Sequence, residues 1–229
     1  MKKCCSIVFL VIFGIVFSQI VRIPDQNFKR QIISLGYDTN DDGQIQWSEV
    51  QKVKQLYINN LDIVNLEGIN SFSNLEELGC YQNKITALDI SKLKKLKYLY
   101  ASGNRISSLN MSGLSELEDL SIEGNLLTAQ LDISNLKKLK NLNFSNNRIS
   151  FINASGLEKL ESIKGENNRL EKIELRNNPN LKLIDLKNNP LKTTVDIRGL
   201  TQLQFFDCTG CNLLFINFSG TVNLKEYYW

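Results

Sequence analysis

The sequence predicts an α/β solenoid, a right-handed coil of short stacked units with one parallel β-strand in each unit. Two observations predict this fold. One apolar pattern recurs from Val53 to the end of the sequence, with a spacing of 21 or 22 residues. The same place in almost every period holds an asparagine or a cysteine. A unit of this length cannot bury its apolar side chains alone, so neighbouring units must stack.

The repeat indicates which side chains point into the coil. In the segment LKYLYASGNRI, from Leu96 to Ile106, apolar residues occupy the first, fourth, sixth and eleventh places. These places are predicted to face inward, where each large apolar side chain contributes roughly 1.5–3 kcal/mol when fully buried. The aligned repeats begin at Leu75, Leu96, Leu117, Leu139, Leu160, Leu181, Leu203 and Leu224.

The ninth place of each repeat is predicted to turn the chain after its strand. An asparagine amide can donate to and accept from backbone groups that a buried turn would leave unpaired. Replacing one such side chain by alanine is expected to cost about 1–3 kcal/mol. The predicted structural ladder is Asn83, Asn104, Asn125, Asn147, Asn168, Asn189 and Cys211, and Leu61 takes the place in a degenerate first unit.

This segment follows the pattern L-x-x-L-x-L-x-x-N/C-x-L, so residues 53–229 resemble the leucine-rich repeat family. The resemblance implies that one parallel strand per repeat lines a concave face. Because the units are short, the convex side is expected to be mostly irregular or 3₁₀, with extended segments and little room for helix.

The start of the chain resembles an export signal. Two lysines precede an apolar run from Ser6 to Phe17, which is too short to span a bilayer comfortably. We expect residues 1–18 to be a signal peptide cleaved after Ser18, with an uncleaved anchor as the alternative. The expected domains are then a helical cap over 19–52 and the repeats over 53–229, in a protein that is secreted, periplasmic or on the cell surface.

The composition excludes several functions. The chain has no histidine, which removes Ser–His and Cys–His catalysis and histidine-ligated metal sites. The net charge is +3, and without Lys2 and Lys3 the 25 basic residues nearly balance the 24 acidic residues. This balance gives no reason to expect nucleic acid or an anionic membrane as a partner.

Cysteine usage predicts structure rather than chemistry. Cys80, Cys208 and Cys211 remain after residue 18, an odd number that argues against a full disulfide framework. The spacing of Cys208 and Cys211 is C-x-x-C, which also occurs in redox and metal sites. Both fall at inward-facing places of the repeat, so we interpret them as buried structural thiols.

A short helix is predicted before the repeats. Asp25 is a suitable N-cap, and Phe28, Ile32 and Leu35 recur with helical spacing on one apolar face. Gly36 is expected to end the helix.

The sequence DTNDDGQIQWSE, residues 38–49, matches the calcium-binding loop of an EF-hand at every place. The predicted ligands are Asp38, Asn40, Asp42, Gln44, Gln46 and Glu49. The alternative is an acidic turn that binds nothing. Since there is one such loop and no partner loop, Ile45 is expected to pack on the first repeat, and the Ca²⁺ is expected to be structural and weakly bound.

The order of parts, from Ile23-Pro24-Asp25 through the loop to short repeats, resembles exported leucine-rich repeat proteins of Bacteroidetes-type bacteria. Tyr81, Tyr98 and Tyr100 would lie on neighbouring strands of the concave face, where rigid aromatic side chains suit partner recognition. The alternative is that they are ordinary surface aromatics that stack across strands.

These features predict a non-catalytic protein that binds a protein or a glycan. One alternative is a structural or adhesive module truncated from a larger cell-surface protein, and self-association through the C-terminal repeat end is a further hypothesis. A hydrolase is less favoured, because paired acids such as Glu118 and Asp119 would face opposite sides of a strand.

Overall fold

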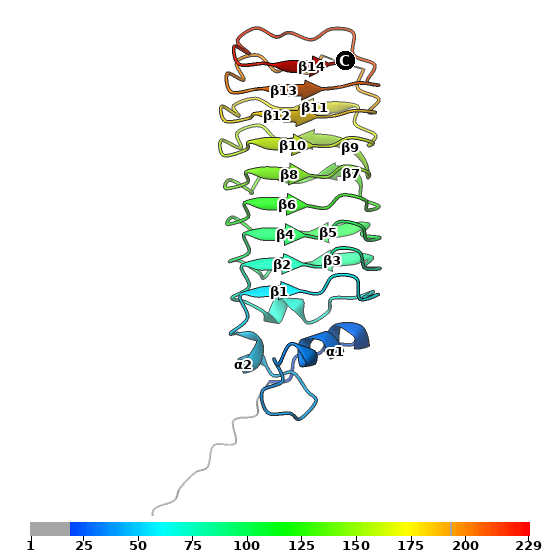
Figure 1. The fold of residues 1–229 in the computed structure, drawn as a ribbon, viewed down its shortest axis with the longest axis vertical. Coiled ribbons are helices and arrows are strands. Elements are labelled where there is room, and N and C mark those ends of the chain that lie inside the picture. Colours follow the sequence, from blue (N-terminus) through cyan, green and yellow to red (C-terminus); the bar gives the residue numbers. More distant parts are fainter. Residues whose placement is uncertain (1–18, 193) are drawn as a thin grey trace, which may run out of the picture.

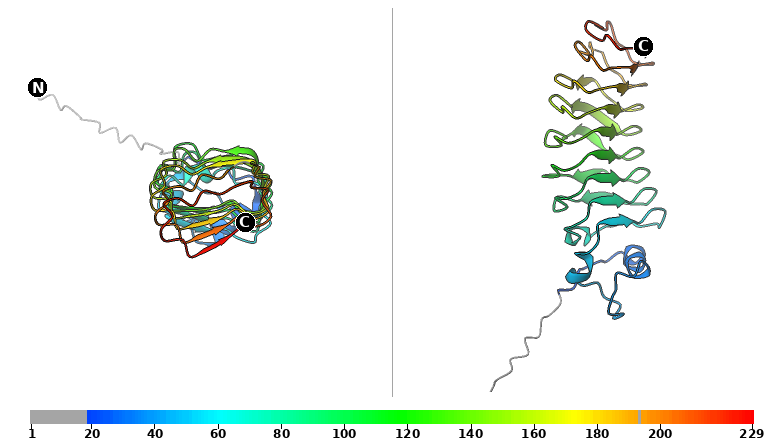
Figure 2. Two further views of the ribbon diagram at one scale, coloured as in Figure 1. Left: turned by 90° about the horizontal axis from the view of Figure 1, so that it is seen from above. Right: turned by 60° about the vertical axis from the view of Figure 1, so that its left-hand side comes forward.

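The computed structural model describes residues 19–192 and 194–229. The predicted signal peptide, residues 1–18, lies outside the described residues. Short strands stack into one long column, with the helices at one end and the C-terminus at the other (Figure 1). Seen along the column, successive coils superimpose around a common interior (Figure 2). The structure confirms the predicted solenoid.

Nine parallel strands form the main sheet, one from each unit of the repeat. The third, fourth and fifth places of one repeat pair with the same places of the next. The fourth-place side chain is buried and its two neighbours point outward, as on β4. The strands are β1 (Gln55–Tyr57), β2 (Glu77–Gly79), β4 (Tyr98–Tyr100), β6 (Asp119–Ser121), β8 (Asn141–Asn143), β10 (Ser162–Lys164), β12 (Leu183–Asp185), β13 (Phe205–Asp207) and β14 (Glu226–Tyr228).

The other side of the coil is mostly extended, and it begins with a 3₁₀ turn, η1 (Ile69–Ser71). Two short parallel ladders form there. One joins β3 (Ala87–Asp89) to β5 (Ser108–Asn110), and the other joins β7 (Thr128–Leu131), β9 (Arg148–Asn153) and β11 (Lys172–Glu174). The break between the ladders falls in the repeat that starts at Leu117 and has 22 residues. In the same repeat, the pairing of β7 with β9 has a register shift between Ala129 and Gln130.

The core is one cluster of aliphatic and aromatic side chains that runs the length of the column. Its packing includes a complementary pair at the sixth place of adjacent repeats. Phe144 is fully buried, and a Cβ atom added to Gly165 would lie 2.2 Å from Phe144 Cζ. The ring therefore takes the volume that a side chain at position 165 would need.

The eighth place of the repeat has a left-handed backbone. The φ angles lie between 53° and 75° at Asn60, Gln82, Gly103, Gly124, Asn146, Asn167, Asn188 and Gly210. This conformation turns the chain out of its strand toward the ninth place. Glycine and asparagine adopt it most readily, which explains the recurring Gly-Asn and Asn-Asn pairs in the sequence.

The first helix, α1 (Gln26–Ser34), begins where the sequence predicts. Asp25 Oδ1 accepts hydrogen bonds from the backbone N–H groups of Asn27 and Phe28, each at 3.0 Å. Phe28 is fully buried, and its ring centroid lies 6.3 Å from that of Phe72. The contact between these rings joins the helix to the first repeats.

The expected apolar face of α1 is shorter than predicted. Ile32 is fully buried, but Leu35 is 44% exposed. The helix ends at Ser34, and Leu35 is its C-cap, so the helical spacing no longer holds at that position. After the acidic loop, α2 (Trp47–Val50) is a single turn.

Candidate binding face and cap loop

The outward side of the main sheet, called here the strand face, consists of the third, fifth and seventh places of the repeats. It corresponds to the expected concave face. Tyr98 and Tyr100 lie on it at the two ends of β4 and are half-buried. Tyr81 follows β2 and is 40% exposed. Among the described residues no ring contact joins these three tyrosines. At the C-terminal end of the strand face, the ring centroids of Phe205 and Tyr228 lie 6.2 Å apart.

A fourth tyrosine belongs to the same face. Tyr57 on β1 occupies the fifth place, like Tyr100, with Gly79 between them in the register. A Cβ atom on Gly79 would lie 2.8 Å from Tyr57 Cδ1, so the glycine leaves room for the ring. Sequence analysis missed Tyr57 because the first unit is degenerate; counting its places back from Leu61 would have found it.

Carboxylates surround these phenols. The Glu77 side chain beside the Tyr57 hydroxyl raises the pKa of that phenol. Burial, followed by the charges of Asp119 and Glu77, raises the pKa of Tyr100. Both hydroxyls therefore keep their protons at neutral pH.

A hollow of about 240 Å³ opens on the strand face between Tyr100 and Lys164. Short polar side chains line it, including Ser121 and Ser162. Asp119 also lines the hollow, and its Oδ1 accepts a hydrogen bond from the side-chain amide of Asn141 at 2.6 Å. The hollow offers hydroxyl and amide groups to a bound side chain or sugar.

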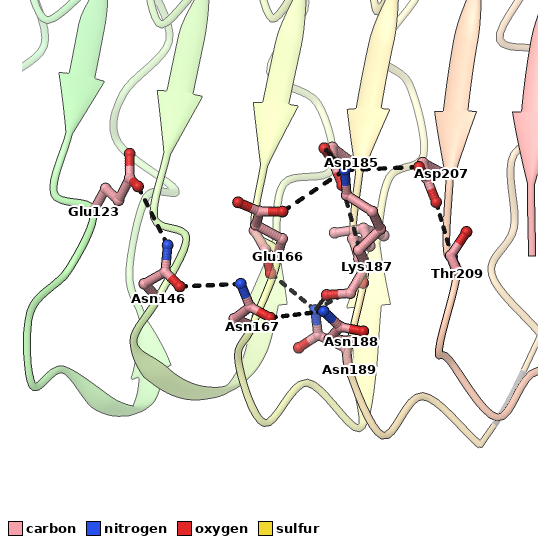
Figure 3. A network of polar contacts seen from close by, with 12 residues as sticks. Glu123, Asn146, Glu166, Asn167, Asp185, Lys187, Asn188, Asn189, Asp207 and Thr209 are labelled. Carbon is pink, nitrogen blue, oxygen red and sulfur yellow. Dashed lines mark hydrogen bonds and ion pairs between the residues drawn. The ribbon is translucent and has the colours of Figure 1, made fainter.

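A lysine surrounded by carboxylates lies farther along the face (Figure 3). Lys187 Nζ is 3.2 Å from Asp185 Oδ2, 3.7 Å from Glu166 Oε2 and 3.8 Å from Asp207 Oδ2. The hydrogen bond and charge of Asp185 raise the pKa of Lys187. Three carboxylates thus share one ammonium group, and the cluster keeps a negative charge.

A chain of exposed amides borders this cluster (Figure 3). Asn188 donates from Nδ2 to Asn167 Oδ1 at 2.8 Å, and Asn167 donates to Asn146 Oδ1 at 3.0 Å. Asn146 in turn donates to Glu123 Oε1 at 3.2 Å. These eighth-place side chains follow the turn of each repeat and form a polar margin.

Each ninth-place asparagine directly follows the eighth-place residue in the sequence, and its side chain is buried. Each amide nitrogen donates to the sixth-place carbonyls of its own repeat and of the preceding one; for Asn125 the acceptors are Ile122 O at 2.9 Å and Ala101 O at 3.1 Å. Each amide oxygen accepts from a backbone N–H of the preceding repeat, as Asn125 does from Ile106 at 3.0 Å. The same arrangement holds at Asn83, Asn104, Asn147, Asn168 and Asn189.

The interpretation of the last two cysteines as thiols is wrong. Cys208 and Cys211 form a disulfide, with their Cα atoms 5.4 Å apart. The left-handed turn at Gly210 brings the two ends of the C-x-x-C segment together. Cys211 Sγ lies 3.3 Å from Leu186 O. The sulfur therefore occupies the position that the side-chain amide nitrogen of asparagine takes in the other repeats. Cys80 is free, and burial raises the pKa of its thiol to about 12.

The cap loop is organised by its own acidic side chains. Asp38 Oδ1 accepts from the backbone N–H of Asp42 at 3.2 Å, and Asp38 Oδ2 accepts from Gly43 N–H at 2.9 Å. Glu49 Oε1 accepts from Thr39 N at 2.7 Å and from Thr39 Oγ1 at 2.8 Å. Glu49 thus ties the start of the loop to its end.

The remaining predicted ligands lie around Asp42. Its Oδ2 accepts from Asn40 Nδ2 at 3.0 Å and from Gln46 Nε2 at 2.7 Å. Its Oδ1 accepts from the backbone N–H of Gln44 at 2.7 Å. These hydrogen bonds lower the pKa of Asp42, the bond from Gln44 most of all. Gln46 Oε1 is buried and makes no hydrogen bond.

The loop around Ile45 pairs with a second segment of the cap, which the sequence did not predict. The segment that starts at Gln19 runs antiparallel to the loop, with a bridge between Ile20 and Gln46. Val21 N donates to Ile45 O at 2.7 Å, and Trp47 N donates to Gln19 O at 2.8 Å. Residues 19–21 thus pair with the loop, and Ile45 is fully buried.

Sequence analysis missed the hydrogen bonds that two side chains form to the backbone of distant segments. Asp25 Oδ2 accepts from Val64 N at 2.8 Å and Asn65 N at 3.2 Å, so one carboxylate links the helix to the first repeat. Asn178, in a segment that resembles a simple turn, is buried and accepts from Leu157 N at 3.0 Å. Its signal is the Asn-Asn pair it shares with the ladder positions.

Comparison with protein families decides the affiliation of the chain. The profile described as "Endo-beta-N-acetylglucosaminidase EndoS LRR domain" matches residues 23–147, more than half of the sequence. The chain belongs to this leucine-rich repeat family. A second profile, "Leucine Rich Repeat", matches residues 138–160 of the leucine-rich repeat protein. No protein with a curated description matches it.

Solved structures with TM-scores above 0.5 show the same fold at low identity. Internalin C2 from Listeria monocytogenes is 24% identical, with a TM-score of 0.52 over 85% of this chain and 93% of that one. A chain of the octameric complex of latrophilin 3, Unc5D and FLRT2 is 23% identical, with a TM-score of 0.60 over 77% and 60%. The functional domain of InlJ from Listeria monocytogenes is 20% identical, with a TM-score of 0.48 over 92% and 60%. The leucine-rich repeat protein thus spans 60% of the length of two of these chains.

No helix in residues 19–192 and 194–229 is both long enough and apolar enough to cross a membrane.

Proposed function

We propose that this leucine-rich repeat protein is exported and binds a protein or glycan through the strand face without catalysing a reaction. One observation carries the proposal: the main sheet presents Tyr57, Tyr98 and Tyr100 on one face, and Tyr100 lines a polar hollow there. Tyrosine supplies large contact area at low entropy cost, and a pre-organised surface loses little freedom on binding.

Two further facts support parts of this proposal. One structural neighbour, the FLRT2 chain, is described within an octameric complex with two other proteins, which is a precedent for partner binding on this fold. The lysines and apolar run at the start of the sequence support export.

A binding screen with face variants tests the proposed function. The protein is presented to peptide and polysaccharide arrays, and each ligand is re-measured with a Tyr98→Ala, Tyr100→Ala double variant. We expect the double variant to lose those ligands, because it removes two aromatic contacts. A Phe151→Ala variant serves as the control, since this half-buried ring lies on β9, on the other side of the coil. Unchanged binding by the double variant would exclude the strand face as the site.

We further propose that the cap loop holds a structural Ca²⁺. Asp38, Asn40, Asp42, Gln46 and Glu49 supply side-chain oxygens, and Gln44 supplies its carbonyl. Within the described residues no three acidic or cysteine side chains form a metal-holding group. The buried, unpaired Gln46 Oε1 supports the proposal, because rotation of this amide would bring an oxygen toward Asp42.

Self-association through the C-terminal end is also proposed. Large apolar side chains are exposed there, in contrast to the buried interior of the column. They are Leu214, Phe215, Val222, Tyr227, Tyr228 and Trp229.

A further inference from the structure

We infer that the strand face binds an extended, basic segment of a polypeptide. This inference rests on the proposed function of that face as a binding surface and names the chemistry of the partner. It is carried by the distribution of charge over the face, by the hollow between β4 and β10, and by the spacing of two carboxylates.

Charge is segregated on the molecule. The whole chain carries almost as many acidic as basic residues, but the third, fifth and seventh places hold Lys164 and Lys187 as their two basic residues. The acidic residues at these places are Glu77, Asp119, Glu123, Glu166, Asp185, Asp207 and Glu226. A face with this excess of carboxylates attracts a cationic partner and disfavours an anionic one.

The lysines that border the face, at the second place of the repeats, cancel only part of this charge. Five lysines and three glutamates occupy this place, and three of the lysines pair with these glutamates. Three pairs have N–O distances of 2.6–2.7 Å: Lys97 with Glu76, Lys140 with Glu118, and Lys182 with Glu161. The border row therefore keeps two net positive charges, five lysines less three glutamates, against five net negative charges of the face, seven acidic residues less two lysines.

Two carboxylates define the spacing of the partner's cations. Asp119 on β6 borders the hollow, and Asp185 lies on β12, three strands farther along the main sheet. The register aligns Asp119 with Leu183, so Asp185 lies two residues farther along the strand direction. At about 4.8 Å per strand and about 3.3 Å per residue, the separation is about 16 Å. Four residues of an extended chain span about 13 Å, and the length of two arginine side chains covers the difference. Side chains four residues apart point to the same side of an extended segment. Two basic side chains with this spacing can together contact Asp119 and the carboxylate cluster around Lys187, to which Asp185 belongs.

The intervening surface favours a neutral centre in the partner. Lys164 lies on β10, between β6 and β12, and pairs with Asp185 in the register. Its positive charge disfavours a third cation of the partner between the two carboxylates. Ser121 and Ser162 offer hydroxyl groups to the backbone or to small polar side chains. At the Asp119 end, Tyr100 adds an aromatic face, to which a guanidinium group is attracted in addition to the carboxylate.

Fluorescence anisotropy with synthetic peptides tests the inference on the full chain. Three eleven-residue serine- and threonine-rich peptides are compared at low salt. The first has arginines at its fourth and eighth positions, the second at its fourth and seventh, and the third has glutamates at the fourth and eighth. We expect the first peptide to bind at least about fivefold more tightly than the second, which is the effect of one well-placed ion pair. The third peptide is expected not to bind.

Charge-matched variants locate the site. Asp119→Asn with Asp185→Asn preserves side-chain shape and removes two charges from the face, so the preference for the first peptide is expected to disappear. Glu158→Gln with Glu171→Gln removes two charges from exposed positions outside the face and is expected to keep the preference. Circular dichroism checks that both variants fold.

The outcomes separate this inference from the proposed function. Equal binding of all peptides, or an equal loss in both double variants, would overturn the basic-segment inference. So would a neutral polysaccharide whose binding depends on the strand face while the arginine peptides fail to bind, because the partner would then be a glycan and the face would still be a binding surface. If no ligand of any class is lost in the tyrosine double variant, the proposed function itself fails.

Discussion

Adjacent asparagines in one turn have different physical roles. Asn167 is exposed, left-handed and bonded to its exposed neighbours, whereas Asn168 is buried and bonded to backbone groups of two repeats. An exposed amide can exchange its partner for water, whereas the buried amide of Asn168 and the backbone groups that it joins cannot. The ninth-place residue therefore contributes more to stability than the eighth.

Replacing one ladder residue tests this difference. We expect Asn125→Ala to lower the free energy of unfolding by about 1–3 kcal/mol. The substitution leaves the buried N–H of Ile106 without its acceptor and removes one of the two asparagine donors to each of two buried carbonyls. Urea unfolding measures the change. Asn135→Ala, at an exposed position, is the matched control and should change stability little. Equal effects of the two substitutions would contradict the proposed role of burial.

The Phe144–Gly165 pair gives a second prediction at this scale. Gly165→Ala places a methyl group within the ring of Phe144, so we expect a loss of about 1–3 kcal/mol from overpacking. Adding Phe144→Leu should recover part of that loss, because the smaller side chain vacates the space. Urea unfolding of the single and double variants measures the coupling, and strictly additive losses would show that the two sites do not interact.

Among the elements, the cap loop is the one whose order depends on a proposed ligand. Calcium at tenfold above its Kd would add about 1.4 kcal/mol, which corresponds to a rise of about 3–6 °C in the unfolding midpoint. Differential scanning fluorimetry with calcium or chelator measures it. Asp42→Asn should reduce the shift, since it weakens a predicted ligand. Asp41→Asn, which removes the same charge at a left-handed non-ligand position, should retain it. No shift in the unmodified protein would remove the calcium proposal.

The row of paired charges at the second place predicts a pH dependence. Hydrogen bonds from Lys97, Lys140 and Lys182 hold the pKa values of Glu76, Glu118 and Glu161 below their ordinary range. Because these pKa values are lower in the folded state, the pairs stabilise the fold above about pH 4.3, and this contribution is lost as the pH falls below that value.

A triple glutamine variant tests that dependence. Glu76→Gln, Glu118→Gln and Glu161→Gln together should make the unfolding midpoint less sensitive to acidification from pH 7 to pH 3. The effect is expected to be small, because these pairs are solvent-exposed. Glu158→Gln with Glu171→Gln, outside the row, provides the comparison. An unchanged pH profile in the triple variant would show that the row does not contribute to stability.

At the scale of the whole molecule, the column leaves β14 at one end of the main sheet with exposed apolar side chains around it. Strand edges and apolar patches favour association. We expect sedimentation velocity to show concentration-dependent dimers or larger species. Val222→Lys should reduce association, because Val222 is 78% exposed at this end, whereas Val64→Lys, at a 52% exposed site near the cap, should not. A monomer at all concentrations would exclude self-association.

The sequence by itself determined the solenoid, its strand register and its buried residues. Every unit must bury the same places against its neighbour, so the same pattern of apolar residues recurs in each repeat and can be recognised in the sequence. Asp25 as a helix cap and Asn125 as a turn residue could be inferred for the same reason: their partners lie at fixed offsets along the chain.

Only the tertiary structure decided which distant groups meet. The pairing of residues 19–21 with the cap loop, the link from Asp25 to Val64, and the disulfide between Cys208 and Cys211 depend on how separate segments pack. The strand face is decided in the same way. Tyr57, Glu77 and Asp119 belong to three different repeats, and stacking brings them to one surface where their charges and rings act together.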